Sequence, residues 1–284
     1  MIKSKIKDIC VVAVFACLLV LGSMFDFRFS DNIYSENNWF NIFIELIAKM
    51  PIYSIGLYAC ASLFVLSSFK VNRYHRIVLY ALYIVGAIVC GALMLEDVVS
   101  VFVESKIKYI ISAVIGIVFF VFFVIGLKDK KETIEVNKKA YLTILFTIAC
   151  IVVITFALKS IMDRTRFVDI ILREGTFTNW YKKGAGGDSM PSGHVASIVA
   201  LFSCLPLLHN TKVIKMQPWL EYLLLSLVAL VVAISRISNG SHFLSDVAVG
   251  GLIAFVISKA FTWLFYGFSE NNNEIKKGSF LDLL

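Results

Sequence analysis

Eight long apolar stretches, separated by short polar segments, constrain this chain more than any other feature of its sequence. Each approaches the roughly 20 apolar residues that a helix needs to cross the hydrocarbon core of a bilayer. They lie at about residues 9–25, 51–69, 76–95, 108–127, 141–159, 193–209, 219–236 and 245–267. None shows the alternation of apolar and polar residues that the wall of a membrane β-barrel requires. The sequence therefore predicts an all-α, polytopic bundle of about eight transmembrane helices.

The composition supports this prediction and argues against a nucleic-acid partner. Hydrophobic residues make up 59% of the 284 residues, and the mean hydropathy is +0.82. The net charge of +7 could suggest nucleic acid, but Lys and Arg lie mostly in short loops rather than in one stripe. The six cysteines all lie in apolar stretches without C-x-x-C spacing, which is typical of small core residues.

The distribution of Lys and Arg predicts the orientation of the chain. With the N-terminus in the cytoplasm, the inner segments carry most of these cations. The outer segments, apart from the polar region described below, carry only Arg28, Lys49, Lys106 and Lys108. We therefore expect a multi-pass protein of the cell membrane with both termini cytoplasmic. Segments 159–192 and 236–245 then both lie at the extracytoplasmic face, where they can meet.

Two outer segments have more than one interpretation. Residues 39–50, WFNIFIELIAKM, are amphipathic and indicate either a helix in the interface or an extension of the second span. Residues 175–189 contain Trp180 and Tyr181, which suit the headgroup layer, and glycines that would allow a mobile cover. An aromatic belt with a flexible linker is the alternative for this loop.

The first polar motif lies at the end of the fifth apolar stretch. Lys159 and Arg166 are seven residues apart, so they share one face if the helix continues that far. Two cations on one face suit a doubly charged phosphate, which Arg can grip through two oxygens. The alternative is a pair of flanking cations that reach toward the headgroups. Arg164 is either a third ligand or a contact with solvent.

The second motif, SMPSGHVAS at 189–197, opens the sixth stretch. Pro191 favours the first turn of a helix, and Ser192 and Gly193 would then present free backbone N–H groups to an anion. His194 follows with a ring that can carry a proton. The motif predicts an anion site, and an interfacial histidine without a role is the alternative for His194.

The third motif, SRISNGSHFLSD at 235–246, joins the seventh and eighth stretches. His242 and Asp246 have the i, i+4 spacing of neighbours on a helix. A carboxylate bonded to one ring nitrogen would leave the other nitrogen of His242 as a nucleophile. The alternative is a helix cap whose charge depends on pH.

A metal site built from His194, His242 and Asp246 is possible in principle. Basic residues aimed at the same point would repel a cation, however, so we expect no metal ion and no other cofactor.

Together the three motifs resemble the signature of the type 2 phosphatidic acid phosphatase (PAP2) superfamily, which is K-x6-R-P, P-S-G-H and S-R-x5-H-x3-D. Here it reads Lys159 to Arg166, Pro191-Ser192-Gly193-His194, and Ser235-Arg236 followed by His242 and Asp246. The order and the spacings match over about the last half of the chain. One position departs, because Phe167 stands where the family has proline.

The resemblance implies a role for each matching residue. His242 would attack phosphorus to form a phosphohistidine, Asp246 would assist it, and His194 would protonate the leaving oxygen. The phosphate would be held by Lys159, Arg166, Ser192, Gly193 and Arg236.

The resemblance also implies a function and a division of the chain. We expect a metal-independent phosphatase that hydrolyses a lipid phosphate monoester or diphosphate at the extracytoplasmic face. Its partners would be membrane lipids, and the oligomeric state stays open. Residues 1–140, about four spans without a comparable polar cluster, would be an N-terminal scaffold or a substrate-specific appendage. Residues 141–267 would be the PAP2-like catalytic core, and 268–284 a cytoplasmic tail. A phosphotransferase with the same site, and a non-catalytic anion-binding or transport protein, are the alternatives.

Overall fold

The computed structural model describes residues 2–36, 38–70, 72–103, 105–184, 186–211 and 216–267, which form helices and loops without a strand. Within these ranges, eight helical segments are long and apolar enough to cross a membrane. The prediction of an all-α transmembrane bundle is therefore confirmed. The tail predicted at 268–284 lies outside the described residues.

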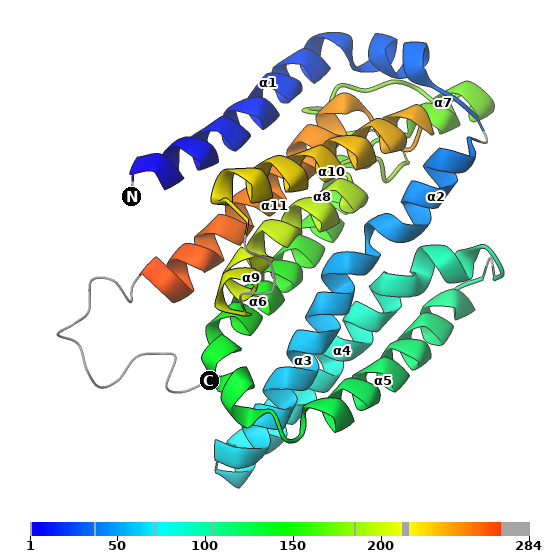
Figure 1. The fold of residues 1–284 in the computed structure, drawn as a ribbon. Helices are drawn as coiled ribbons and strands as arrows, with labels where there is room; N and C mark the ends of the chain where they lie inside the picture. Colours follow the sequence, from blue (N-terminus) through cyan, green and yellow to red (C-terminus); the bar gives the residue numbers. More distant parts are fainter. Residues whose placement is uncertain are drawn as a thin grey trace.

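Figure 1 labels the helices in chain order. They are α1 (Ile2–Ile33), α2 (Trp39–Ala48), α3 (Met50–Lys70), α4 (Arg73–Ser100), α5 (Ile107–Leu127), α6 (Lys131–Met162), α7 (Phe167–Arg173), α8 (Gly193–Val199), the 3-10 turn η1 (Ala200–Cys204), α9 (Leu205–Thr211), α10 (Pro218–Ser238), α11 (Leu244–Thr262) and the π turn η2 (Trp263–Gly267).

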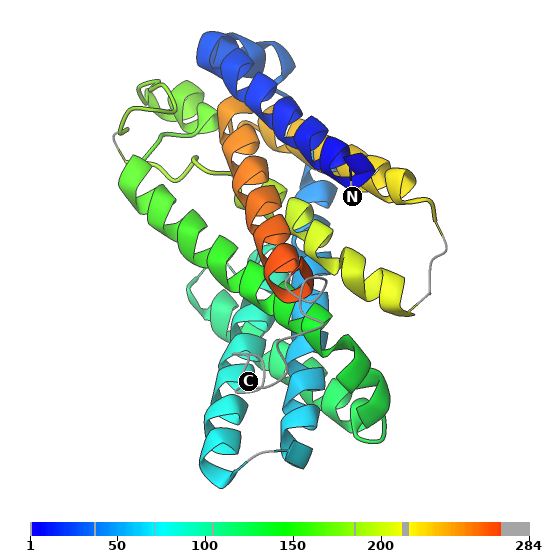
Figure 2. The same ribbon diagram turned by 90° about the vertical axis from the view of Figure 1, so that its left-hand side faces the viewer.

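Two groups of helices form the bundle. One group, α3, α4 and α5, packs at one side of the molecule, and α1 packs against α10 and α11 at the other (Figure 1, Figure 2). Helix α6 contacts α3 of the first group and α11 of the second. The division predicted at residue 140 stays a prediction, but α1 lies against the C-terminal helices rather than with α3, α4 and α5.

The amphipathic segment at 39–50 continues into the second span. Helix α2 ends at Ala48 and α3 begins at Met50, so only Lys49 separates them. Its backbone stays in the right-handed helical region, with φ −83° and ψ −25°. Residues 39–69 therefore form one nearly continuous helical segment, which supports the extension rather than a separate interfacial helix.

Polar contacts hold α1 near both of its ends. Toward its C-terminal end, the buried carboxylate of Asp26 accepts hydrogen bonds from Arg164 Nη2 and from the Ser245 N–H, each at 2.9 Å. Near its other end, Asp8 Oδ1 lies 2.9 Å from Lys259 Nζ. An ion pair inside an apolar bundle needs both partners in place, so these contacts fix where α1 lies against α11.

Candidate active site

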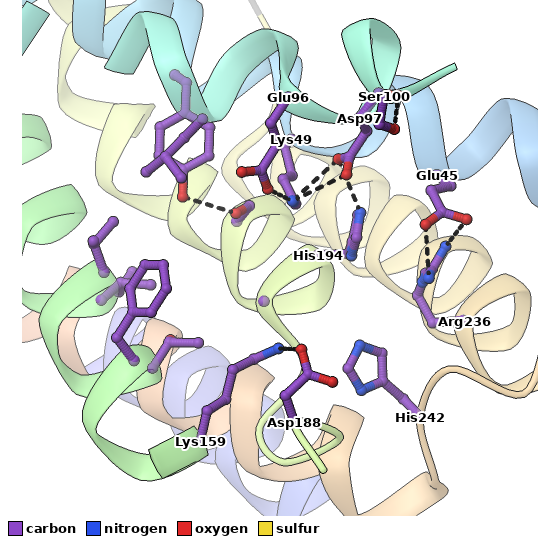
Figure 3. Close-up of a pocket in the computed structure, with 18 of the residues that line it drawn as sticks. Glu45, Lys49, Glu96, Asp97, Ser100, Lys159, Asp188, His194, Arg236 and His242 are labelled. Carbon is purple, nitrogen blue, oxygen red and sulfur yellow. Dashed lines mark hydrogen bonds and ion pairs between the residues drawn. The ribbon is translucent and has the colours of Figure 1, made fainter. Parts of the chain in front are cut away.

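A cavity of about 340 Å³ lies where the ends of α6 and α10 meet the starts of α8 and α11 (Figure 3). The predicted site residues that line it are Lys159, Arg166, Gly193, His194, Arg236 and His242. Ser192 and Asp246 are buried and do not line it. The structure thus brings residues of all three motifs together.

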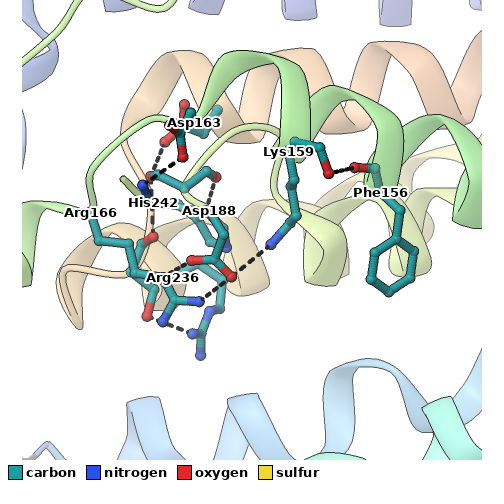
Figure 4. A network of polar contacts seen from close by, with 12 residues as sticks. Phe156, Lys159, Asp163, Arg166, Asp188, Arg236 and His242 are labelled. Carbon is teal, nitrogen blue, oxygen red and sulfur yellow. Dashed lines mark hydrogen bonds and ion pairs between the residues drawn. The ribbon is translucent and has the colours of Figure 1, made fainter. Parts of the chain in front are cut away.

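Lys159 and Arg166 both bind the carboxylate of Asp188, a residue that the sequence reasoning did not single out (Figure 4). Arg166 Nε and Nη2 lie 2.7 and 2.9 Å from the two carboxylate oxygens, and Lys159 Nζ lies 3.5 Å from one of them. Burial opposes ionisation of Asp188, but the two cations outweigh it and hold its pKa below the ordinary value. A carboxylate therefore lies where the prediction expects a phosphate.

Arg166 does not share the helix of Lys159. Helix α6 ends just before Asp163, whose backbone is left-handed with φ 49°, and Arg166 is the N-cap of α7. Phe167 therefore occupies the first position of α7, which is also a position that proline favours. Its ring is fully buried and packs 5.4 Å from that of Phe27. The helix still starts here despite the departure from the family pattern.

His242 lies in the loop between α10 and α11 and is only 3% exposed. Its Nδ1 is 2.5 Å from the carbonyl oxygen of Ser189. A carbonyl can only accept a hydrogen bond, so Nδ1 carries the proton and Nε2 keeps its lone pair. Burial, together with the nearby cations Lys159 and Arg236, lowers the pKa of His242 well below the ordinary value. The ring is thus neutral with one free nitrogen, as a nucleophile requires.

The expected bond between Asp246 and the His242 ring is absent from the structure. His242 precedes α11, whose N-cap is Phe243, so the i, i+4 geometry of a helix does not apply. Asp246 Oδ2 instead accepts hydrogen bonds from the Ser189 hydroxyl at 2.6 Å and the Phe243 N–H at 2.8 Å. The carbonyl oxygen of the same serine binds His242. Asp246 therefore contacts Ser189, and Ser189 contacts the ring.

Arg164 is neither a phosphate ligand nor a contact with solvent. Its side chain is fully buried, with Nη1 2.5 Å from Asp246 Oδ1 and Nη2 2.9 Å from Asp26 Oδ2. The guanidinium also lies 4.3 Å from the centre of the Phe243 ring. Arg164 therefore ties α1 to the start of α11 behind the cavity.

The second motif begins α8 at Gly193, the expected start of the sixth stretch, but Pro191 does not lie in its first turn. Ser192 is the N-cap, Pro191 lies before the helix, and the Ser192 N–H donates to the Asp246 carbonyl at 3.0 Å. The buried Ser192 hydroxyl has no hydrogen-bond partner among the described residues. Such a group costs about 1–3 kcal/mol. An anion that accepts this hydrogen bond would remove that cost.

Arg236 lies in the last turn of α10 and lines the cavity. Its Nη1 lies 2.9 Å from Glu45 Oε2 on α2, and its Nη2 donates to the Ser241 hydroxyl at 2.7 Å. Its Nε is buried without a hydrogen-bond partner in the part of the chain that the structure describes. Arg236 therefore has a donor left for a ligand.

The opposite wall of the cavity comes from the N-terminal half, so the prediction that this half lacks a polar cluster was wrong. His194 Nε2 lies 3.2 Å from Asp97 Oδ2, at the end of α4 (Figure 3). Lys49 Nζ lies 3.1 Å from the same Asp97 oxygen and also binds Glu96. Two adjacent acids at the end of an apolar stretch were a signal that could have revealed this wall, because polar groups inside membranes are costly.

Among the residues that the structure describes, one group of possible metal ligands occurs, in the cavity wall. Ligand atoms of Glu45, Asp97 and His194 lie within 4.8 Å of one another. Each carboxylate already has a cation, Arg236 for Glu45 and Lys49 for Asp97. These ion pairs leave little negative charge for a metal ion, so the arrangement fits a network of ion pairs better than a metal centre.

The loop at 175–189 packs tightly against the site. A Cβ on Gly187 would lie 2.2 Å from the Arg164 carbonyl oxygen, and one on Gly184 would lie 2.4 Å from that of Asp163. Trp180 Nε1 donates to the Ser23 hydroxyl at 2.7 Å. These glycines therefore permit a close approach of two backbones, which does not support the expected mobile cover.

The comparisons with known proteins match the part of the chain that carries the three motifs. Residues 140–270 match the family model described as PAP2 superfamily. No curated protein and no solved structure gives a significant match. The matched range contains every residue predicted from the three motifs, whereas Glu45, Lys49 and Asp97 precede it.

Proposed function

The chain belongs to the PAP2 superfamily, and on that basis we propose that it is an integral-membrane phosphatase of phosphorylated lipids. It would hydrolyse a lipid phosphate monoester or diphosphate through a phosphohistidine intermediate. The observation that carries the proposal is one cavity lined by two histidines and by Lys159, Arg166 and Arg236. Fixed donors of this kind stabilise the charge that develops on phosphate oxygens during transfer.

The phosphate would be held by the cations that line the cavity. Lys159 and Arg166 would exchange the carboxylate of Asp188 for phosphate oxygens, while Arg236 Nε would gain the acceptor that it lacks. Gly193 lines the cavity without a side chain, which allows the ligand to approach the backbone.

His242 would be the nucleophile. Its Nε2 attacks phosphorus, and the Ser189 carbonyl keeps the ring in the required tautomer. Asp246 supports this arrangement by accepting the Ser189 hydroxyl hydrogen bond. His194, in the facing wall, would protonate the leaving oxygen. Water then releases the phosphate from His242 in a second step.

A lipid is the substrate class that the cavity favours. Next to the cations, the lining includes Leu93, Ile151, Val152 and Phe156. Phe156 is 59% exposed on α6. A polar pocket that continues into an apolar wall at the end of a transmembrane helix suits a phosphate headgroup with its acyl chains. Lys and Arg are more frequent in the segments on the other side of the membrane, which supports an extracytoplasmic position for this pocket.

The test is phosphate release by the purified protein across phosphatidic acid, phosphatidylglycerol phosphate, an isoprenyl diphosphate and a lipid A type glycolipid. We expect His242→Ala and His194→Ala to insert normally but to lose activity, His242→Ala by more than about 1,000-fold. His75→Ala is the matched control, because His75 is exposed at the start of α4.

Three further results would distinguish the proposal from its alternatives. Vanadate should inhibit as a phosphate mimic, and a chelator should leave the activity unchanged. The product should be free phosphate, because a phosphorylated acceptor lipid would indicate a phosphotransferase. Substantial turnover by His242→Ala would contradict the mechanism.

A further inference from the structure

The two histidines of the cavity differ in what holds them. The partner of His242 is the neutral Ser189 carbonyl, at 2.5 Å from Nδ1. The partner of His194 is the Asp97 carboxylate, at 3.2 Å from Nε2. A neutral acceptor suits a ring that begins the reaction uncharged, whereas a carboxylate suits a ring that begins it as a cation.

Asp97 is itself held in place. Lys49 lies 3.1 Å from the Asp97 oxygen that faces His194, and it is fixed by its bond to Glu96. The side chains of Asp97 and Lys49 are 18% and 13% exposed, and His194 is 8% exposed as a residue. The contact therefore joins groups with little freedom to move, in contrast to an ion pair on a protein surface.

Several charged or titratable groups face His194 from different elements. They are Asp97 of α4, Glu45 of α2, Lys49 between α2 and α3, Arg236 of α10, and the ring of His242. Burial of the His194 ring, and after it Lys49 and Arg236, oppose a positive charge there, and Asp97 favours one. Among these groups, Asp97 is the one with a hydrogen bond to the His194 ring in the part of the chain that the structure describes.

We propose that Asp97, outside the matched family range, is the positioning residue that holds His194 as the general acid for the leaving group. The inference rests on the proposed phosphatase function. It assigns the N-terminal helices a part in the chemistry, beyond a scaffold.

The proton balance of both steps follows from this geometry. Asp97 accepts the hydrogen bond from His194 Nε2–H, so Nδ1 is the nitrogen that serves the substrate. When His242 Nε2 bonds to phosphorus, the bond to the leaving oxygen breaks and that oxygen takes the Nδ1 proton. In the second step His194 Nδ1 takes a proton from the attacking water, and the bond from phosphorus to His242 breaks.

The experiment compares two small esters that differ in how much their leaving oxygen needs a proton. Hexyl phosphate releases a strongly basic alkoxide, whereas 4-nitrophenyl phosphate releases a stable phenolate. We expect Asp97→Asn to lower kcat/KM, which reports the step that releases the leaving group, by about 100-fold for hexyl phosphate, within the range that general acids contribute. For 4-nitrophenyl phosphate kcat/KM should change by less than about 3-fold, which also shows that the variant is folded.

Glu96→Gln is the matched control. It removes a negative charge from the same end of α4, and this charge also pairs with Lys49. Glu96, however, has no bond to His194. The ratio of the two kcat/KM values should therefore stay that of the wild type. In a His194→Ala background, Asp97→Asn should cause no further loss for hexyl phosphate, because the two residues act as one unit.

The outcomes separate this inference from the proposed function. Equal losses for both esters, or an additive loss in the His194→Ala background, would overturn the role of Asp97 and leave the phosphatase function intact. A wild-type protein that releases no phosphate from lipids or from either ester would overturn the function, and the inference with it.

Discussion

Asp188 places a carboxylate between the two cations that the proposed reaction needs for a phosphate. Arg166 grips both of its oxygens, and Lys159 lies 3.5 Å away. The Asp188 side chain is 55% exposed and that of Arg166 is 36% exposed, so solvent weakens this pair. The carboxylate is thus a competitor that a phosphate, with more charge and more oxygens, can displace.

Asp188→Asn should strengthen binding of phosphate and vanadate by about 3- to 5-fold, the factor that matches a partly exposed ion pair. The measurement is calorimetric titration of the purified protein, or the inhibition constant of vanadate. Weaker binding by the variant would show instead that Asp188 organises Lys159 and Arg166 for the ligand.

The buried His242 makes the stability of the protein depend on pH. Its pKa is lowered in the folded state by burial and by nearby cations, whereas an unfolded histidine titrates near 6.5. Below about pH 6.5 the unfolded chain therefore binds a proton that the folded chain does not. Stability that is present above this pH is lost as the pH falls, by at most about 1.4 kcal/mol per pH unit.

We expect the melting temperature in detergent to fall between pH 7.5 and 5.5, and to fall less steeply in His242→Gln. Differential scanning fluorimetry at a series of pH values measures both slopes. Identical slopes in the two proteins would mean that His242 takes up its proton as easily when folded as when unfolded.

At the scale of single helices, contact with a neighbour decides where small residues are needed. Gly91 of α4 faces Gly116 of α5, and a Cβ on Gly91 would lie 2.5 Å from the Gly116 Cα. Close approach between membrane helices depends on such small residues, because lipid provides no hydrophobic force to hold the helices together. The glycines of these two stretches are alike in the sequence, and only the packing distinguishes them.

Gly91→Val should lower the melting temperature by several degrees, because the added side chain forces α4 and α5 apart. It should also lower activity, since α4 carries Asp97. Gly126→Val is the control on α5, where a Cβ meets nothing within 4 Å. Thermal unfolding of both variants in the same detergent makes the comparison, and equal effects would contradict the proposed contact.

At the scale of the whole molecule, the site joins both halves of the chain. Around the site, three acids of the N-terminal half each bind a residue of the C-terminal half: Asp26 binds Arg164, Glu45 binds Arg236, and Asp97 binds His194. The cavity therefore depends on how α1, α2 and α4 pack against the helices of the matched family range.

The orientation of the molecule has a direct test. In a variant without native cysteines, Ser105→Cys next to α5 should react with a membrane-impermeant maleimide on intact cells. Asp129→Cys, at the other end of α5, should react only after the membrane is made permeable. The reason for this expectation is that the segments assigned to the cytoplasm carry most of the Lys and Arg residues. The reverse labelling pattern would place the cavity at the cytoplasmic face.

The sequence by itself determined the eight spans, because each span is a continuous apolar stretch that local hydropathy reveals. It also determined that the motifs meet at one face of the membrane. Counting spans places the ends of the fifth and seventh stretches on the same side as the starts of the sixth and eighth. Within each motif the residues lie close together in the chain, so their spacing is visible without a structure.

Only the tertiary structure decided which residues the motif side chains bind. Asp246 was expected to hold His242, but it binds Arg164 and Ser189 because His242 lies outside α11. The bond between Asp97 and His194 joins residues 97 positions apart. Periodicity within a helix carries no information about such pairs, because they depend on how helices pack and on the pairing that buried charges require.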